Sequence, residues 1–203
     1  MTLRGALTAL LIPALLASGG AARAAAQGGS TWKAHVGASV KVAPPPILLE
    51  TTRDLYFGSV GPGSDVAVPA RPPYSAGTWS AGVRFNNLRK TVAYGIRFTL
   101  PANLTNGTQN LPVTWSGTQY GWLCVWNTTT STPASCNVQQ VSYNPTSHTA
   151  AGSELMVDLP NNTPQNNVFA ADVYVGGRLI VPNVSLAPGV YSAPLTVTIS
   201  VLN

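Results

Sequence analysis

The sequence predicts an all-β fold in which two antiparallel sheets pack as a sandwich. Short apolar segments recur along the chain, turn-forming residues separate them, and no segment has the periodicity of an amphipathic helix. The 203 residues include 19 Gly and 17 Pro, whereas charged residues make up only 8%. This composition is typical of a turn-rich, exported β protein.

The first 26 residues have the features of a secretory signal peptide. Arg4 precedes an apolar run over residues 6–17, and small residues occupy positions 24–26. The apolar run is shorter than the ~20 residues that a membrane-spanning helix needs, and no later stretch is long enough. We therefore expect no membrane span and a mature chain that begins near Gln27. We expect it to be exported to the periplasm, the cell surface or the extracellular space.

The remaining chain, roughly 175 residues, has the size of one domain. Its first part, residues 27–46, has apolar side chains at four alternate positions: Val36, Ala38, Val40 and Val42. The alternation predicts a strand, which the three prolines at 44–46 end. Two interpretations stay open, because this strand is either the first of the domain or a donor strand followed by a proline linker. We expect the sandwich domain to cover residues 47–203.

Beyond residue 46, segments with strand composition alternate with turn signals. We expect strands over residues 47–52, 54–60, 66–68, 78–86, 91–100, 111–115, 120–126, 138–143, 154–159, 169–175, 178–181 and 195–201. Gly58 predicts a bulge or bend, and residues 61–64 and the Asn106-Gly107 pair predict turns. We expect residues 78–86 and 91–100 to pair as a hairpin that turns near Asn87.

The last predicted strand has the clearest pattern. Apolar residues alternate with Thr and Ser at Leu195, Val197, Ile199 and Val201. A period of two is expected when one face of a strand is buried and the other is in water. The C-terminal segment is therefore predicted to be a structural strand.

Two cysteines, Cys124 and Cys136, enclose a short loop that is rich in Thr and Ser. In an exported protein we expect them to form a disulfide that clasps a hairpin or its loop. Closing a loop of this size contributes about 3 kcal/mol in the chain-entropy model. A metal site would need more ligands, and His35 and His148 are far apart in the sequence. We expect no metal and no cofactor.

The segment over residues 111–143 is rich in aromatic residues. Its tryptophans either belong to the core or form an exposed platform on which a glycan stacks: Trp115, Trp122 and Trp126. The second interpretation predicts a monomeric secreted adhesin or carbohydrate-binding module.

Basic residues concentrate in one part of the chain: Arg84, Arg89, Lys90 and Arg97. We interpret them as solvated edge and turn charges, and the alternative is a patch for an anionic polysaccharide or lipid. The formal charge of +5 falls to about +3 once Arg4 and Arg23 leave with the signal peptide. We expect no nucleic-acid partner.

Catalytic motifs are lacking in the sequence. The six acidic residues are scattered, without the spacing of a carboxylate pair, and neither a nucleophile elbow nor an HExxH pattern occurs. We expect that the protein is not an enzyme.

Two phrases of the sequence resemble those of bacterial exported β-sandwich proteins. The first is DLYFGSV at residues 54–60, and the second runs from VGGRLIVP at 175–182 through APGVYSAPLTVTISV at 187–201. Both resemble a pilin-like family of uncharacterised function, related to spore coat protein U and the chaperone-usher pilins. The two phrases bracket nearly the whole predicted domain.

The resemblance implies an immunoglobulin-like sandwich that serves as a structural subunit of a bacterial surface appendage or coat. In chaperone-usher pilins, an N-terminal strand of one subunit fills a groove in the next by strand addition. The implied partners are further copies of the chain or other surface subunits, together with a periplasmic chaperone. Under this interpretation, the alternate residues at 36, 38, 40 and 42 are the strand-donor positions.

Overall fold

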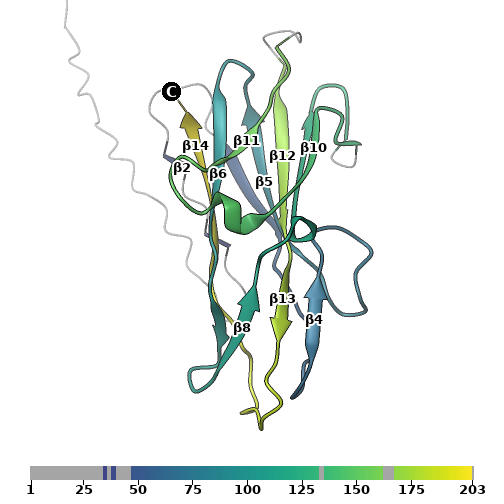
Figure 1. Cartoon of the computed structure of the whole chain (residues 1–203). Coiled ribbons are helices and arrows are strands. Elements are labelled where there is room, and N and C mark those ends of the chain that lie inside the picture. The colour runs from purple at the N-terminus through teal and green to yellow at the C-terminus, as the bar shows by residue number, and fades with distance from the viewer. Residues whose placement is uncertain (1–33, 36–37, 40–46, 133–134, 162–166, 203) are drawn as a thin grey trace, which may run out of the picture.

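The computed structural model describes residues 34–35, 38–39, 47–132, 135–161 and 167–202. These residues form an all-β sandwich, which confirms the predicted fold class (Figure 1). The predicted signal peptide and the prolines at 44–46 lie outside the described residues. None of the helices in the described ranges is long and apolar enough to cross a membrane.

One layer of the sandwich is a five-stranded antiparallel sheet, called here the β9 sheet. In spatial order its strands are β10 (Gln139–Tyr143), β9 (Gly121–Asn127), β12 (Phe169–Val175), β5 (Ala81–Leu88) and β3 (Leu48–Arg53). The β9–β10 hairpin carries the cysteines, as the sequence predicts, since Cys124 lies on β9 and Cys136 on the loop before β10.

The second layer is the β14 sheet. Its antiparallel strands are β14 (Leu195–Leu202), β6 (Ala93–Thr99) and β11 (Leu155–Val157). On the other side of β14 lie two short strands that run parallel to it, β1 (Ala34–His35) and β2 (Ala38–Ser39). They fall within the N-terminal segment 27–46, where the sequence predicts a strand, and Val36, Val40 and Val42 of that strand lie outside the described residues.

A third, smaller sheet lies at one end of the sandwich, where β13 continues from β12 after Gly176 (Figure 1). Its strands are β4 (Asp65–Val68), β13 (Gly177–Ile180), β8 (Asn110–Thr114) and β7 (Asn103–Thr105). Two short 3-10 helices, η1 (Thr118–Tyr120) and η3 (Pro145–His148), connect strands. The predicted turn at Asn106-Gly107 joins β7 to β8, and Gly107 has a φ of 91°.

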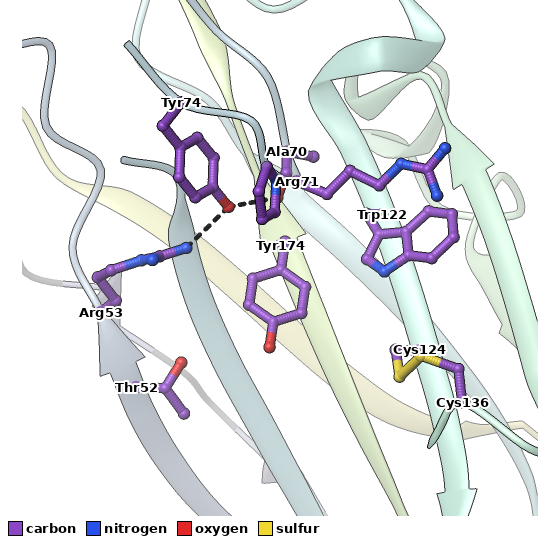
Figure 2. Close-up of a pocket in the computed structure, with 10 residues that line it drawn as sticks. Thr52, Arg53, Ala70, Arg71, Tyr74, Trp122, Cys124, Cys136 and Tyr174 are labelled. Atoms are coloured by element: carbon purple, nitrogen blue, oxygen red, sulfur yellow. Dashed lines mark hydrogen bonds between the residues drawn. A yellow bond between two sulfur atoms is a disulfide. The ribbon is translucent and has the colours of Figure 1, made fainter. Parts of the chain in front are cut away.

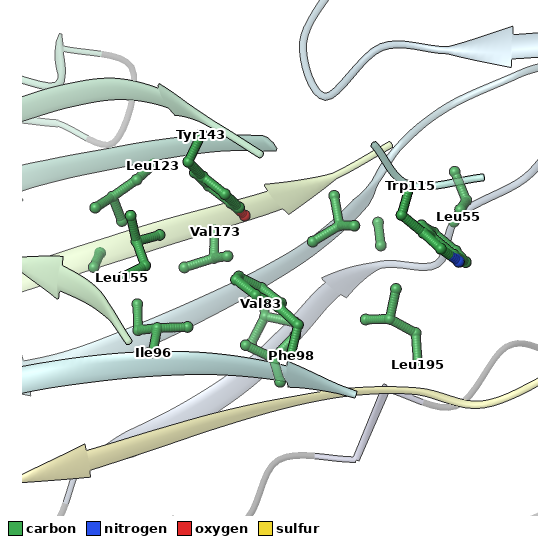
Figure 3. Packing of buried hydrophobic residues seen from close by; sticks show 14 of the residues in the cluster. Leu55, Val83, Ile96, Phe98, Trp115, Leu123, Tyr143, Leu155, Val173 and Leu195 are labelled. Atoms are coloured by element: carbon green, nitrogen blue, oxygen red, sulfur yellow. The ribbon is translucent and has the colours of Figure 1, made fainter. Parts of the chain in front are cut away.

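The core fills the space between the β9 and β14 sheets. Alternate side chains from the central strands of both sheets point inward, and several are almost fully buried: Val83, Phe85, Ile96, Phe98, Leu123, Val173, Val197 and Ile199. Phe98 of β6 stacks on Tyr143 of β10 with ring centroids 5.4 Å apart, so the two layers meet directly (Figure 3). Burial of these side chains supplies the main driving force for folding.

The predicted hairpin of residues 78–86 and 91–100 is wrong. β5 and β6 belong to different sheets, and the chain crosses the sandwich between them. Asn87 has a φ of 64°, and the Tyr94 hydroxyl accepts a hydrogen bond from the Arg89 amide at 3.0 Å. The two strands pack face to face because each has one apolar face, and the core lies between them.

The predicted strand at 54–60 is also wrong. Only an isolated bridge between Tyr56 and Trp79 is present there. The apolar alternation is nevertheless real, because Leu55 and Phe57 are buried in the core. Gly58 has a φ of 79°, which turns the backbone away from strand geometry, in agreement with the predicted bend.

We expect Phe98→Ala to lower the free energy of unfolding by about 3–5 kcal/mol, since it leaves a cavity between the layers. Met156→Ala on β11 is the matched control, because the Met156 side chain is exposed. Urea denaturation followed by tryptophan fluorescence measures both. Equal, small losses for the two variants would contradict the placement of Phe98 at the centre of the core.

Candidate functional site

The outer face of the β9 sheet carries a second apolar cluster. Trp122, Cys124 and Trp126 alternate along β9 and pack with Ala170 of β12 on the side away from the main core. Cys124 is bonded to Cys136, with Cα atoms 4.9 Å apart. The predicted disulfide is therefore present, and it covers part of this outer face.

Arginine side chains cover the tryptophans of this cluster. The Arg71 guanidinium lies 4.3 Å from the ring centroid of Trp122, and that of Arg84 lies 5.1 Å from the ring centroid of Trp126. The two tryptophans are only 9% and 3% exposed. Neither ring presents an open face to solvent.

Trp115, the third predicted stacking residue, lies in the main core. Its side chain is 5% exposed, and its indole Nε1 donates a hydrogen bond to the Pro101 carbonyl at 2.7 Å. A ring in this position cannot stack on a glycan without opening the sandwich, so Trp115 leaves the set of candidate binding residues. Sequence reasoning had no means to separate it from Trp122 and Trp126.

A charged network crosses the strands beside the tryptophans. Arg84 donates from Nε and Nη2 to the two carboxylate oxygens of Asp172, at 2.7 and 3.0 Å. The Tyr174 hydroxyl donates to the same carboxylate at 3.1 Å. Asp172 is only 2% exposed, and the hydrogen bonds compensate for the desolvation of its charge. The hydrogen bond that Arg84 donates to Asp172 also raises the pKa of Arg84.

The phenol of Tyr174 has a raised pKa of about 12. Burial is the largest cause, and the Asp172 carboxylate adds to it, since a phenolate would repel that charge. The Tyr174 ring lies against Gly82 of β5, where a side chain would meet both this ring and the Thr52 hydroxyl. Gly82 therefore leaves the ring room to lie against the sheet.

A pocket of about 550 Å³ opens beside this network (Figure 2). Tyr174, Trp122 and the disulfide lie along it, and Arg53, Tyr74 and Arg71 surround it. The chain over residues 70–74 contributes part of its wall and is anchored by the hydrogen bond from the Ala70 amide to the Gln119 carbonyl at 2.8 Å. The pocket thus combines aromatic surface with two guanidinium groups.

Arg53 joins the end of β3 to this wall. It donates from Nε to the Ser80 carbonyl at 2.8 Å and from Nη2 to the Tyr74 hydroxyl at 2.9 Å and Ser80 Oγ at 3.0 Å. Ser80 Oγ and the Tyr74 hydroxyl also bond the Ala70 carbonyl. These bonds hold the Arg53 side chain in one orientation.

An apolar groove of about 520 Å³ lies elsewhere in the molecule, between residues 56–62 and residues 186–192. Leu104, Leu111 and Leu179 of the small sheet line it. The second wall is held by Gln109, whose Oε1 accepts a hydrogen bond from the Ala187 amide at 2.7 Å. The groove and the pocket share no lining residue.

Several large apolar side chains at the groove are open to solvent. Val190 is 57% exposed and Tyr56 is 42% exposed, and Tyr56 stacks on Trp79 with ring centroids 4.9 Å apart. Such an apolar surface, when it adjoins a groove, is typical of a place where another chain docks.

The predicted basic residues do not form one patch. Arg84 is paired with Asp172 on the outer face of the β9 sheet, whereas Arg97 lies on β6 in the other sheet. Arg89 and Lys90 lie in the crossover between β5 and β6. In the part of the chain that is described, no group of three or more His, Cys, Asp or Glu is placed to hold a metal ion.

Comparisons of the chain with protein-family models, with curated proteins and with solved structures found no match.

We expect one tyrosine to titrate near pH 12, and Tyr174→Phe to abolish that step. The raised pKa of Tyr174 also stabilises the fold below pH 10, and this contribution is lost as the pH rises from 10 towards 12. Phenolate absorbance measures the titration, with Tyr56→Phe, at an exposed ring, as the control. Burial also raises the pKa of Tyr143, so a high-pH step from that phenol should remain. An unchanged amplitude of the step near pH 12 in Tyr174→Phe would contradict the assignment.

Proposed function

We propose that this protein is a structural subunit of a bacterial cell-surface appendage or coat and that it assembles by β-strand pairing. The observation that carries this proposal is the apolar groove between residues 56–62 and 186–192, which lies directly over residues of the core. The lining residues Leu111 and Leu179 are each 1% exposed and form the apolar floor of the groove, so a partner would contact mainly exposed lining residues such as Val190 and Tyr56.

The edge of β14 gives a partner strand its backbone contacts. β14 pairs with β6 from Thr196 to Leu202 on one side. On its other side, among the described residues, it pairs only with residues 34–35 and 38–39. A strand from another chain would take this edge by displacing β1 and β2, and main-chain hydrogen bonds would then supply the affinity.

The N-terminal segment of a second copy is the partner that we propose. Its four alternate apolar residues at 36, 38, 40 and 42 match the period of a strand that places one face in an apolar groove. Within one chain, β1 and β2 run parallel to β14. Parallel pairing is slightly less stable per residue than antiparallel pairing, so an antiparallel strand from a second copy would compete well for this edge.

The family resemblance supports the same location. The phrase at 54–60 contributes one wall of the groove, and the APGVYS part of the second phrase, residues 187–192, contributes the other. The immunoglobulin-like topology and the pilin-like role that the resemblance implies belong to this proposal. An exposed groove would also need protection before assembly, which is the role proposed for a periplasmic chaperone.

Export is part of the proposal. The disulfide between Cys124 and Cys136 fits an oxidising compartment, and the predicted signal peptide would direct the chain there. The periplasm, the cell surface and the extracellular space all meet this requirement. We propose no catalytic role.

The alternative function, a monomeric adhesin or carbohydrate-binding module that uses a tryptophan platform, has less support. Arg71 and Arg84 cover the rings of Trp122 and Trp126, and Trp115 belongs to the core. A glycan would need a different surface from the predicted one.

We expect Val36→Asp/Val40→Asp to abolish polymers of the exported protein while a folded monomer remains, because two charges would then enter an apolar groove. Ser39→Asp, on the opposite face of the same predicted strand, is the control and should still assemble. Light scattering and negative-stain microscopy measure particle size. Removal of residues 27–46 should give the same monomer, and if it instead unfolds the protein, the segment is the domain's own first strand and the proposal fails.

A second test changes the groove itself and leaves the N-terminal segment intact. We expect Val190→Asp to reduce assembly strongly without loss of stability. Val184→Asp is a closely matched control, since Val184 and Val190 are both 57% exposed and only Val190 lines the groove. Equal assembly of these two variants would rule out the groove as the contact between subunits.

A further inference from the structure

Three arginines on the outer face of the β9 sheet stack on aromatic rings, but they differ in their partners. Arg53 lies over Tyr74 at 5.0 Å, Arg71 over Trp122 and Arg84 over Trp126. Arg84 is paired with Asp172, whereas the described part of the chain offers no carboxylate to Arg53 or Arg71. Both of these arginines line the pocket of about 550 Å³.

The contact with Trp122 holds the Arg71 side chain in a position where it can bind a ligand. The guanidinium carbon of Arg71 lies 4.3 Å from the centroid of the Trp122 ring, so a cation–π contact holds this side chain over the indole. Arg71 makes no hydrogen bond among the described residues, so its N–H donors are available. A carboxylate is the group that a guanidinium fork binds best, through two parallel hydrogen bonds.

The second guanidinium is held by the protein itself. Arg53 is fixed by its bonds to Ser80 and to the Tyr74 hydroxyl, and Ser80 is fully buried. Two positive charges thus border one pocket, and the Asp172 carboxylate beneath it is already neutralised by Arg84. The pocket therefore favours an anion.

The rest of the lining is suited to a ring with hydroxyl groups. Tyr174 presents a half-buried ring, Pro72 and Ala70 add apolar surface, and Thr52 adds an exposed hydroxyl (Figure 2). The volume lies within the range of about 300–1,000 Å³ that is usual for small-ligand sites. A simple inorganic anion would use the charges and leave these surfaces without a partner.

We propose that this pocket binds acidic saccharides, with the carboxylate of a uronic acid bound by Arg71, the sugar ring against Tyr174, and Arg53 adding positive charge on the other side of the pocket. This inference is independent of strand-mediated assembly, because the pocket and the groove share no residue. It also differs from the predicted tryptophan platform, since here Trp122 supports an arginine and does not itself stack on the sugar.

The test uses trigalacturonic acid as the probe and the full exported protein. Tryptophan fluorescence reports binding, because Trp122 lies directly beneath Arg71. We expect saturable binding that weakens with added salt, and no binding of the methyl-esterified trisaccharide. Arg71→Gln should lower the affinity about tenfold or more, which is the loss expected for one charge-assisted contact.

Arg97→Gln is the matched control, since it removes the same charge from the other sheet and should bind as the wild type does. Val190→Asp should also bind normally, which separates this result from any failure of assembly. Three outcomes would overturn the proposal: equal binding of the methyl ester, wild-type binding by Arg71→Gln, or inorganic phosphate that competes as strongly as the trisaccharide. Absence of saturable binding to trigalacturonic acid would overturn it as well.

Discussion

The packing of two sheets through their inner faces is the constraint on which the rest of the structure depends. Alternate residues such as Phe85 on β5 and Phe98 on β6 point to one core, so the central strands place their apolar faces inward, whereas the edge strand β3 is largely exposed. β9 departs from simple alternation, because all its residues are buried. Its outer tryptophans need a cover, which the disulfide, Arg71 and Arg84 supply. The pocket is a consequence of that cover.

Period-two patterns predict most strands well, because a strand with one buried face needs apolar residues at alternate positions. They do not tell which sheet a strand joins, so the interpretation of residues 78–86 and 91–100 as a hairpin is wrong. The alternation of Leu55 and Phe57 reports burial in the core, but Gly58 interrupts the strand. The disulfide was predictable, because the chain has only two cysteines.

The candidate sites were harder to predict, because their residues come together only in the fold. Arg53, Arg71 and Tyr174 are far apart in the sequence and meet through the register of β3, β5, β12 and β9. The tryptophans are easily identified in the sequence as candidate stacking residues, but their exposure depends on which side chains cover them in the fold. One signal was present: apolar residues on both faces of β9 indicate that its outer face also has a cover. For the groove, the sequence carried no signal: residues 56–60 and 187–192 belong to the two family-like phrases, but nothing in the phrases indicates that these residues face each other.

Assembly and ligand binding would use separate parts of one sandwich. A strand from a second copy would bind along β14 and the groove, and the outer face of the β9 sheet would remain accessible to saccharides. The central claim is that the edge of β14, which β1 and β2 occupy within one chain, is the contact between subunits. Hydrogen exchange at Leu195–Leu202, compared between monomer and polymer fractions, tests it most directly. Stronger protection of these amides in the polymer is the predicted result, and equal protection in both fractions would contradict the claim.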